Sequence, residues 1–206
     1  LNLHPSLIPK HRGPSPVATT ILEGDEWTGV TVMLLDSGMD TGPVLAQSDP
    51  VAVTGRDTQV TLTGRLFEIG ATLLPPTLEA YASGEMTPTP QDNSLATASR
   101  LLKREDGRID WNMSAIEIHR QVRAFDPWPG TSTMWNGQNL KVLSALIGPK
   151  DALAPGEVKS GSDVIYIGTG AGQLEVQELQ LEGKSRMSAA AFMRGYPDID
   201  GALLGV

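Results

Sequence analysis

The chain has 206 residues, of which 16 are Lys or Arg and 24 are Asp or Glu, so its formal net charge at pH 7 is −8. Such a charge excludes bulk electrostatic attraction to nucleic acid, and any contact of that kind requires a local basic patch. The absence of cysteine excludes a disulfide scaffold, a thiolate zinc site and a cysteine nucleophile, and it is consistent with a reducing compartment. The composition, 40% hydrophobic and 19% charged, is that of a globular protein of one or two domains, without an apolar run long enough for a transmembrane helix.

The first 84 residues have the pattern of short strands and helices in an α/β domain. Alternation and apolar runs predict strands at 1–4, 29–36 and 44–53, the last interrupted near Asp49-Pro50, and a short helix at 17–22. Prolines between positions 5 and 16 predict a rigid loop after the first strand. A longer helical stripe follows at 58–83, where Pro75 and Pro76 predict a kink or a split.

Residues 85–99 are rich in Thr, Pro, Ser, Asn and Gln and predict a linker to a second domain at 100–206. In that domain Ser114 and Glu117 form a capping-box pattern that opens a helix. The Asn136-Gly137 pair between two apolar segments is typical of a β-hairpin. Further short strands are predicted at 156–158, 164–168 and 174–181, and together they indicate a small β-barrel.

Asn2 and His4 are the first candidate functional residues. They are two positions apart at the end of a strand, so both side chains point to the same face. Ligands of open α/β sheets bind at strand carboxyl ends, where an amide can stabilise an oxyanion and an imidazole can move a proton near neutral pH. The same pattern is also that of a polar strand end with a hydrogen-bonded histidine, and the residues alone leave both interpretations open.

A carboxylate partner for the imidazole is predicted in the loop after the strand at 29–36. Asp40 lies in this loop, and a carboxylate beside a histidine orients the ring and favours its protonated form. Asp36 is the second candidate, and spacing does not choose between the two. An aspartate before Thr-Gly is also a good turn former, so an Asx-turn is the structural alternative for Asp40.

The remaining candidates have mainly structural interpretations. Lys10, His11 and Arg12 form a basic run suited to a phosphate or carboxylate, although a solvated loop face is expected for His11. His119 is expected on a helix surface, and the three histidines have no metal-site spacing. The glycine loop from Gly168 to Gly172 has no following helix, which predicts a turn between strands rather than a phosphate site. Three tryptophans are expected in the core or an interface: Trp111, Trp128 and Trp135.

Several of these segments together resemble the methionyl-tRNA formyltransferase family. Asn2 to Gly13 resembles the family's folate-site signature, an Asn-x-His followed by a Ser-Leu-Leu-Pro motif and Arg-Gly. The stretch from Gly29 to Gly42 resembles its second catalytic motif, and both motifs are shared by the wider family of 10-formyltetrahydrofolate-dependent transferases and hydrolases. Three stretches resemble the C-terminal domain of the tRNA enzymes: Lys103 to Trp111, Arg123 to Gly130 and Gln180 to Ala189.

The resemblance implies a fold, a reaction and a site. The fold is a partial, Rossmann-like α/β formyltransferase domain with a parallel sheet at 1–84, a linker at 85–99, and a mostly-β OB-like barrel domain at 100–206. The reaction is cytoplasmic formyl transfer from 10-formyltetrahydrofolate to the amino group of methionyl-initiator-tRNA, with no metal and no membrane partner, and a monomer is the working expectation. The implied catalytic residues are Asn2, His4 and Asp40, and the implied folate contacts are Ser6, Leu7, Ile8 and Pro9.

Departures from the family pattern and two alternatives accompany this interpretation. The family's first half of the nucleotide-fold domain does not precede Asn2, so the chain is expected to be a fragment that is inactive, or nearly so, by itself. Ile8 stands where Leu is usual, a mild change of similar volume.

Two alternative functions stay open. One is a sugar-amine formyltransferase or a formyltetrahydrofolate hydrolase with the same three residues, and the other is a non-catalytic tRNA-binding module. Phosphate contacts of such a module would come from Arg100, Lys103, Arg104, Arg108, Arg120 and Arg123.

Overall fold

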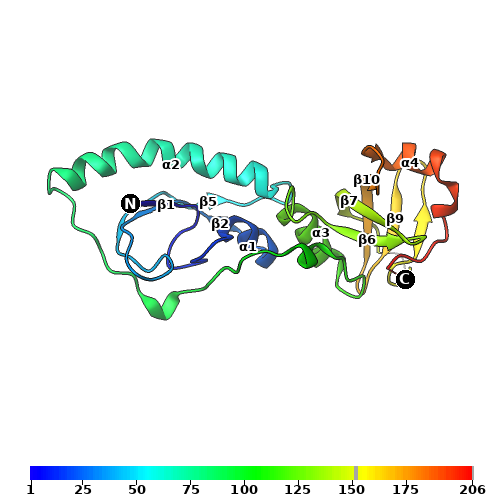
Figure 1. Ribbon diagram of the computed structural model, residues 1–206, viewed down its shortest axis with the longest axis horizontal. Helices are drawn as coiled ribbons and strands as arrows, with labels where there is room; N and C mark the ends of the chain where they lie inside the picture. Colours follow the sequence, from blue (N-terminus) through cyan, green and yellow to red (C-terminus); the bar gives the residue numbers. More distant parts are fainter. Residues whose placement is uncertain (151–152, 206) are drawn as a thin grey trace. The chain divides into compact units, whose positions relative to one another are not determined.

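The computed structural model describes residues 1–150 and 153–205, and the chain divides into two compact units (Figure 1). Unit 1 is Leu1–Leu102 and unit 2 is Lys103–Val206. The predicted C-terminal domain at 100–206 includes positions 151, 152 and 206, which lie outside the described residues. Where the structure describes the chain, no helix has both the length and the apolar character that a membrane span requires.

Unit 1 is a mixed α/β assembly with very short strands. Three strands form one sheet in which β3 lies between β1 and β4, and β2 pairs with β5. Both strand pairs of the three-stranded sheet are antiparallel in the described part of the unit, whereas the expected Rossmann-like sheet is parallel. The elements are β1 (Asn2–His4), α1 (Pro16–Glu23), β2 (Trp27–Thr28), β3 (Thr31–Met33), β4 (Val44–Gln47), β5 (Val51–Ala52), α2 (Gln59–Ala82) and the 3-10 helix η1 (Asn93–Leu95).

The predicted elements of unit 1 differ from the observed ones mainly in length. The first strand, the short helix and the interruption at Asp49-Pro50 are confirmed. The strand predicted at 29–36 is shorter, because its apolar character continues through Leu34 and Leu35 into a loop. Apolar composition alone therefore does not mark where a short strand ends.

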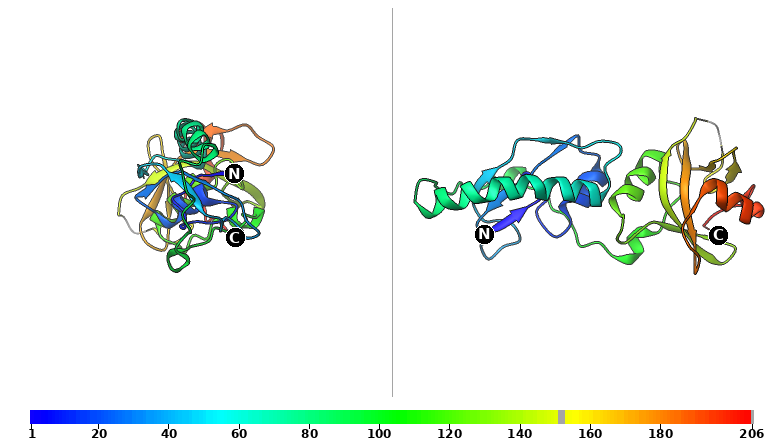
Figure 2. Two further views of the ribbon diagram at one scale, coloured as in Figure 1. Left: turned by 90° about the vertical axis from the view of Figure 1, so that its left-hand side faces the viewer. Right: turned by 90° about the horizontal axis from the view of Figure 1, so that it is seen from above.

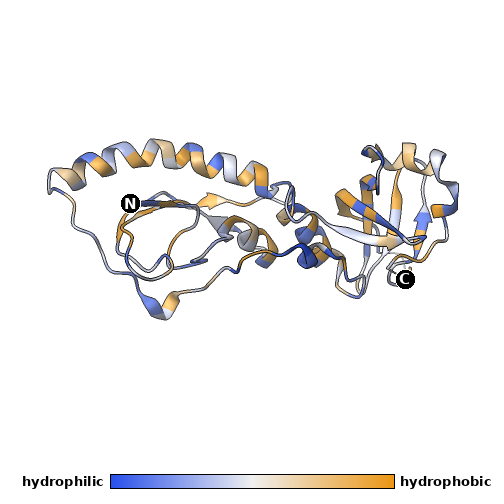
Figure 3. Cartoon of the chain, viewed as in Figure 1, coloured by the Kyte–Doolittle hydropathy of each residue, from blue (hydrophilic) through white to orange (hydrophobic). Residues whose placement is uncertain are grey.

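α2 is one unbroken helix along unit 1, although two prolines lie within it (Figures 1 and 2). Apolar and polar residues alternate along its length (Figure 3). It begins with a capping box in which the Thr58 hydroxyl accepts from the Thr61 N–H and the Thr61 hydroxyl accepts from the Thr58 N–H. The helix does not split at Pro75 and Pro76. Both prolines are exposed, so water can reach the carbonyl groups one turn earlier that lose an N–H partner.

The segment after α2 runs back along unit 1. Thr89 and Val44 exchange two backbone hydrogen bonds of 2.8 Å, and Ala98 pairs with Arg12 in a parallel bridge. The stretch for which the sequence predicts a linker thus hydrogen-bonds both to β4 and to the residues that follow β1.

Unit 2 is built on an antiparallel sheet with the strand order β6-β7-β10-β9-β8, and β11 pairs with β10. No pairing joins β6 to β8 in the described residues, so the sheet is a half-barrel there rather than a closed barrel. The elements are η2 (Arg104–Gly107), α3 (Ala115–Ala124), β6 (Ser132–Trp135), β7 (Gln138–Ile147), β8 (Val158–Ser160), β9 (Ile165–Gly168), β10 (Gln173–Leu181), β11 (Met187–Ser188), α4 (Ala189–Gly195) and η3 (Pro197–Ile199).

Three local predictions for unit 2 are confirmed. Ser114 and Glu117 form the capping box of α3. Asn136 and Gly137, with φ of 49° and 73°, make the two-residue turn between β6 and β7, as a type I′ hairpin requires. The glycine loop at 168–172 connects β9 to β10, so it is a turn between strands.

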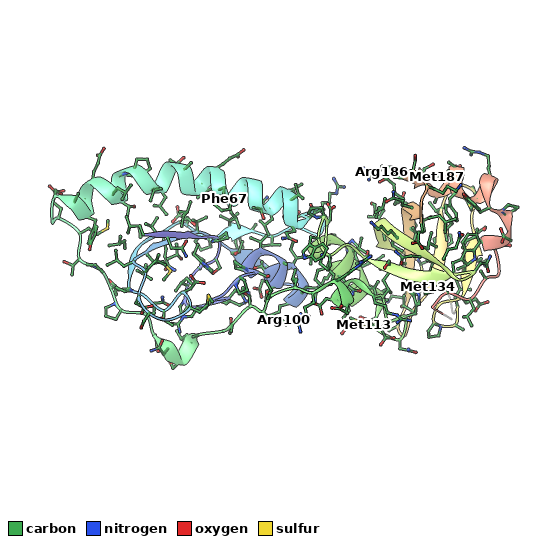
Figure 4. The ribbon with its side chains drawn as sticks, in the orientation of Figure 1. Phe67, Arg100, Met113, Met134, Arg186 and Met187 are labelled. Atoms are coloured by element: carbon green, nitrogen blue, oxygen red, sulfur yellow. The ribbon has the colours of Figure 1, made fainter. Side chains whose placement is uncertain are left out.

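The sheet and its helices enclose one apolar core in unit 2. α3 packs on β7 and β10, and α4 packs on β10 and β11. The rings of Trp135, Phe192 and Tyr196 contact one another within this core. Met113 and Met187 pack against it from the margin (Figure 4). Inward residues of the strands alternate with outward ones, which is why the sequence predicts these strands well.

Candidate active site

The carboxylate of Asp40 joins the predicted catalytic residues. The Asn2 side-chain amide donates to Asp40 Oδ1 at 3.0 Å, and the Gly13 backbone N–H donates to Asp40 Oδ2 at 2.8 Å. His4 Nδ1 lies 3.6 Å from Asp40 Oδ2. The structure therefore brings Asn2, His4 and Asp40 into one cluster.

β1 and the loop after β3 supply these side chains. β1 pairs antiparallel with β3 and places Asn2 opposite Met33, so the loop that follows Met33 begins beside Asn2. Gly42 allows this loop to close, because a Cβ there would lie 2.0 Å from the Leu34 carbonyl oxygen. Asp40 has a left-handed backbone with φ of 54°, a conformation that is uncommon for residues other than glycine and concentrates at functional sites.

His4 is buried, with 3% of its surface exposed. Its Nε2 lies 3.0 Å from the His11 carbonyl oxygen, which can only accept, so Nε2 carries a proton and donates. Nδ1 is then the nitrogen that can take up a second proton, and it faces Asp40. Burial lowers the pKa of His4, while the His11 carbonyl and the Asp40 charge raise it and the charge of His11 lowers it. The net lowering keeps the ring neutral near pH 7, as a proton acceptor must be.

Asp36, the other candidate carboxylate, has local partners. The Gly38 N–H and the Thr41 hydroxyl both donate to its Oδ1, at 3.0 and 2.7 Å. These hydrogen bonds, with that from Thr41 the stronger influence, lower the pKa of Asp36. The turn-forming role considered for Asp40 therefore belongs to Asp36, and the carboxylate beside the imidazole is that of Asp40.

The four predicted folate contacts, Ser6 to Pro9, differ in their surroundings. Ser6 is buried, and its hydroxyl donates at 2.6 Å to the backbone carbonyl four residues further on. Leu7 is half-buried. Ile8 and Pro9 line a cavity of about 340 Å³ together with β4 and residues 89–92. The last two residues are thus the members of this segment that face a described cavity.

Within the basic run at 10–12, Lys10 is exposed but His11 is buried. His11 is 1% exposed, its Nε2 lies 2.6 Å from Asp25 Oδ2, and Lys10 Nζ lies 2.6 Å from Asp25 Oδ1. The expectation of an exposed His11 is wrong, because Asp25, just after the end of α1, pairs with its ring. Glu23 completes a group of three potential metal ligands within 4.8 Å of one another, but the Lys10 ammonium on the same carboxylate disfavours a cation there.

Gln91 is a site residue that the sequence does not reveal. Its side-chain amide lies between Arg12 and the carbonyl groups of Asp40 and Gly42, with hydrogen bonds to all three residues. It falls in the stretch of Thr, Pro, Ser, Asn and Gln that predicts only a linker. No periodicity or spacing distinguishes it there from its polar neighbours.

Unit 2 carries a separate cavity of about 610 Å³. Arg104, Arg108 and Lys141 give its lining positive charge, and Trp128 contributes a ring that is 55% exposed. Of the two places expected for the tryptophans, a core or an interface, the core holds Trp111 and Trp135 but not Trp128. A basic surface with an exposed ring can hold a phosphate backbone and stack a base.

His119 is buried rather than exposed. It is 8% exposed, and its pKa is lowered to about 4 by burial first and then by the charges of Arg123 and Arg120. Gln121 on the same helix is also buried, so the buried face of α3 is wider than its apolar stripe. The sequence predicts an exposed His119 because it is a polar residue beside the apolar stripe of this helix.

Known families and relatives match both units. The formyl transferase family model matches residues 1–78, and the formyl transferase C-terminal domain model matches residues 101–197. The methionyl-tRNA formyltransferase of Chloroflexus aurantiacus is 48% identical over 202 residues, which cover 95% of this chain and 64% of that protein. The chain thus spans about two thirds of the length of such relatives, slightly less in this case.

Two solved structures share the fold at low sequence identity. HypX from Aquifex aeolicus, solved in complex with tetrahydrofolic acid, has a TM-score of 0.72 and 22% identity, covering 96% of this chain and 34% of that one. An N-formyltransferase from Helicobacter canadensis, solved with folinic acid and dTDP-3-aminofucose, has a TM-score of 0.67 and 21% identity, covering 85% of this chain and 64% of that one.

Proposed function

The chain belongs to the methionyl-tRNA formyltransferase family, and we propose that it takes part in formyl transfer from 10-formyltetrahydrofolate to the amino group of methionyl-initiator-tRNA. The observation that carries the proposal is the Asp40 carboxylate, which lies against Asn2, His4 and the Gly13 N–H. An amide, an imidazole and a carboxylate at one point are the groups that acyl transfer to an amine requires.

Each of the three side chains has a role in this chemistry. As the amine attacks the formyl carbon, negative charge develops on the formyl oxygen. Asn2 has a second amide N–H, beyond the one it donates to Asp40, for that oxygen. His4 takes up, at its Nδ1 beside the Asp40 carboxylate, the proton that the amine loses. The bond between the formyl carbon and N10 of the folate then breaks, and the protonated His4 gives its proton to N10 as tetrahydrofolate leaves. Holding amine and carbonyl in register contributes on the order of 7–11 kcal/mol to lowering the barrier.

A folate co-substrate fits the residues around this cluster. Its formyl group finds an N–H donor and a proton acceptor in Asn2 and His4. Leu35 and Met39, on the loop that carries Asp40, are 62% and 67% exposed and offer apolar surface to a ring system. Within the segment Ser6, Leu7, Ile8 and Pro9, we propose Ile8 and Pro9 as the direct contacts and the other two as their support.

The tRNA partner is assigned to the basic cavity of unit 2. Arg104, Arg108 and Lys141 supply cations for phosphates, and Trp128 supplies a face on which a base can stack. The chain's net charge of −8 gives no general attraction, so binding depends on this local patch and weakens with salt.

We also propose a domain scheme for the chain. It assigns residues 1–84 to the catalytic domain, 85–99 to a linker and 100–206 to an OB-like barrel domain. The half-barrel sheet of unit 2 supports the last of these. We propose that the protein acts in the cytoplasm, where translation takes place, and that it is a monomer.

The alternative acceptor of the formyl group is the amine of a sugar, as in a sugar-amine formyltransferase. The Helicobacter canadensis enzyme, solved with an amino sugar nucleotide, shares the fold but only 21% of the sequence. Identity of 48% to a methionyl-tRNA formyltransferase favours the tRNA acceptor. The choice is tested by offering both acceptors to the same protein.

The full-length protein should transfer label from formyl-labelled 10-formyltetrahydrofolate to methionyl-initiator-tRNA and not to a dTDP-linked amino sugar. His4→Ala should lower this rate at least about 100-fold, since a positioned acid–base group contributes that much, while folate binding is retained. His119→Gln, a histidine change in the other unit, is the matched control and should leave the rate unchanged. Transfer to the sugar alone, or a normal rate in His4→Ala, would contradict the proposal.

A further inference from the structure

One glutamine amide connects the two backbone segments that form the Asp40 cluster. Gln91 Nε2 donates to the Asp40 carbonyl at 2.9 Å and to the Gly42 carbonyl at 2.6 Å. Gln91 Oε1 accepts from Arg12 Nε at 2.9 Å and from Arg12 Nη2 at 2.7 Å. All hydrogen-bonding groups on this side chain thus serve either the loop that carries Asp40 or the segment after β1.

The chemistry of the partners fixes the orientation of this amide. A guanidinium group only donates and a carbonyl oxygen only accepts, so Oε1 must face Arg12 and Nε2 must face the loop. The two carbonyls that Nε2 holds flank Thr41 and belong to the tight part of the loop, where Asp40 has its left-handed backbone. A bridge across these carbonyls favours that conformation over the extended one, which would turn the Asp40 side chain away from His4.

Backbone hydrogen bonds also fix the segment that contains Arg12, on the other side of the bridge. The Arg12 N–H donates to the Thr97 carbonyl at 2.9 Å, and the Ser99 N–H donates to the Arg12 carbonyl at 2.6 Å. The next residue, Gly13, gives its N–H to Asp40 Oδ2 and has φ of 106°, and a Cβ there would lie 2.6 Å from the Ser99 carbonyl oxygen. The segment after α2 therefore fixes the backbone that holds the carboxylate.

We propose that Gln91 is a positioning residue for the reaction: by bridging Arg12 to the Asp40 and Gly42 carbonyls, it holds the Asp40 carboxylate between Asn2, Gly13 and His4. The proposal rests on the proposed formyl transfer and adds to it a residue whose side-chain amide is engaged by Arg12 and the Asp40 loop. It also gives the segment after α2 a part in the site.

Two substitutions separate this role from simple anchoring of Arg12. Gln91→Leu removes both sets of hydrogen bonds at similar volume. Gln91→Glu keeps acceptor oxygens for Arg12 but places an oxygen, not an N–H, against the two carbonyls. If Gln91 acts on the Asp40 loop, both variants of the full-length protein lose kcat by roughly 10- to 100-fold with little change in KM, since small displacements of reacting groups have effects of this size.

Asn93→Ala is the matched control. Asn93 Oδ1 accepts from the same Arg12 Nη2 at 2.8 Å but, among the described residues, has no hydrogen bond to the Asp40 loop, so its loss should leave kcat unchanged. Wild-type kcat in Gln91→Leu would overturn the proposal. Wild-type kcat in Gln91→Glu combined with a loss in Gln91→Leu would also overturn it, because Gln91 would then act only through Arg12.

An NMR titration of His4 gives a second readout that does not depend on activity. The charged or titratable groups that act on His4 are Asp40, which raises its pKa, and His11, which lowers it. A displaced Asp40 raises the His4 pKa less, so Gln91→Leu should titrate below the wild type, in the same direction as Asp40→Asn, and Asn93→Ala should not. An unchanged His4 pKa in Gln91→Leu contradicts the positioning role. Absence of formyl transfer by the wild type would contradict the proposed function instead, and the titration would still decide the role of Gln91.

Discussion

Unit 1 and unit 2 differ in the contacts that stabilise each of them internally. In unit 2 the apolar residues of a half-barrel sheet and two helices form a single buried cluster. In unit 1 the strands are two to four residues long, and the loops around Asp40 are fixed by hydrogen bonds from side chains to backbone. The hydrophobic effect has no preferred direction, whereas a hydrogen bond weakens when its distance or angle leaves a narrow range. The candidate chemistry lies in unit 1, beside loops that these directional contacts position.

The largest effect that tests this difference should come from one charge in unit 1. Asp40→Asn keeps the side-chain volume but removes the charge beside His4 and turns one of two acceptors toward Asn2 or Gly13 into a donor. Formyl transfer by the full-length protein should fall on the order of 1000-fold, about 4 kcal/mol of transition-state stabilisation, at nearly unchanged folate affinity. Steady-state kinetics with tRNA as the varied substrate measure this.

Asp36→Asn supplies the control within the same loop. Asp36 accepts its hydrogen bonds from Gly38 and Thr41 within its own turn, so its variant should retain a rate close to the wild type. A larger loss in Asp36→Asn than in Asp40→Asn would show that the wrong carboxylate has been assigned to the imidazole. It would also remove the basis for placing the chemistry in the hydrogen-bonded unit.

The same difference explains what could be predicted from the sequence. The strands of unit 2, its Asn136-Gly137 turn and the Ser114 cap follow from local patterns, each with a single physical cause, and all three are observed. Asn2 and His4 could be paired because side chains two apart on a strand share a face. The sheet closure of a barrel could not be predicted, since it depends on pairing between distant strands.

The contacts that complete the site have no local signal. Asp36 and Asp40 are equivalent in the sequence, but the folded loop places Asp40 beside the histidine and Asp36 in its own turn. Gln91 meets the Asp40 loop through a separation of 51 residues, which no periodicity encodes. Burial of His11 and His119 was missed for a related reason, because the groups that cover a polar residue come from elsewhere in the chain.

The buried histidines His4 in unit 1 and His119 in unit 2 differ in the groups that shift their pKa values. Burial lowers the pKa of both His4 and His119. The His11 carbonyl and then Asp40 partly offset this for His4, whereas Arg123 and Arg120 lower the pKa of His119 further, to about 4. The unfolded chain binds more protons than the folded one between the ordinary histidine value of 6.5 and this value. Unit 2 should therefore lose stability as pH falls through this window, by about 2 kcal/mol between pH 7 and pH 5 from His119 alone.

Urea unfolding at both pH values, compared with His119→Gln, isolates this contribution. Glutamine does not titrate, so the variant should lose less stability on acidification than the wild type. Parallel pH dependence in the wild type and the variant would mean that His119 is as easily protonated in the folded state as in the unfolded chain. It would then not be the uncompensated histidine that the contrast with His4 requires.

The smallest expected effect tests whether the two units are independent. Each has a helix with a capping box: Thr58 with Thr61 in α2, and Ser114 with Glu117 in α3. Replacing either cap residue by alanine should cost about 1 kcal/mol, because one helix N–H loses its acceptor. In calorimetry Thr58→Ala should lower the transition of unit 1 alone and Ser114→Ala that of unit 2 alone. In the double variant the two costs should add to within about 0.5 kcal/mol, because the sites share no partners. A larger deviation would mean that unit 1 depends on unit 2 for its stability, and that the contacts around Asp40 depend on the apolar core of unit 2.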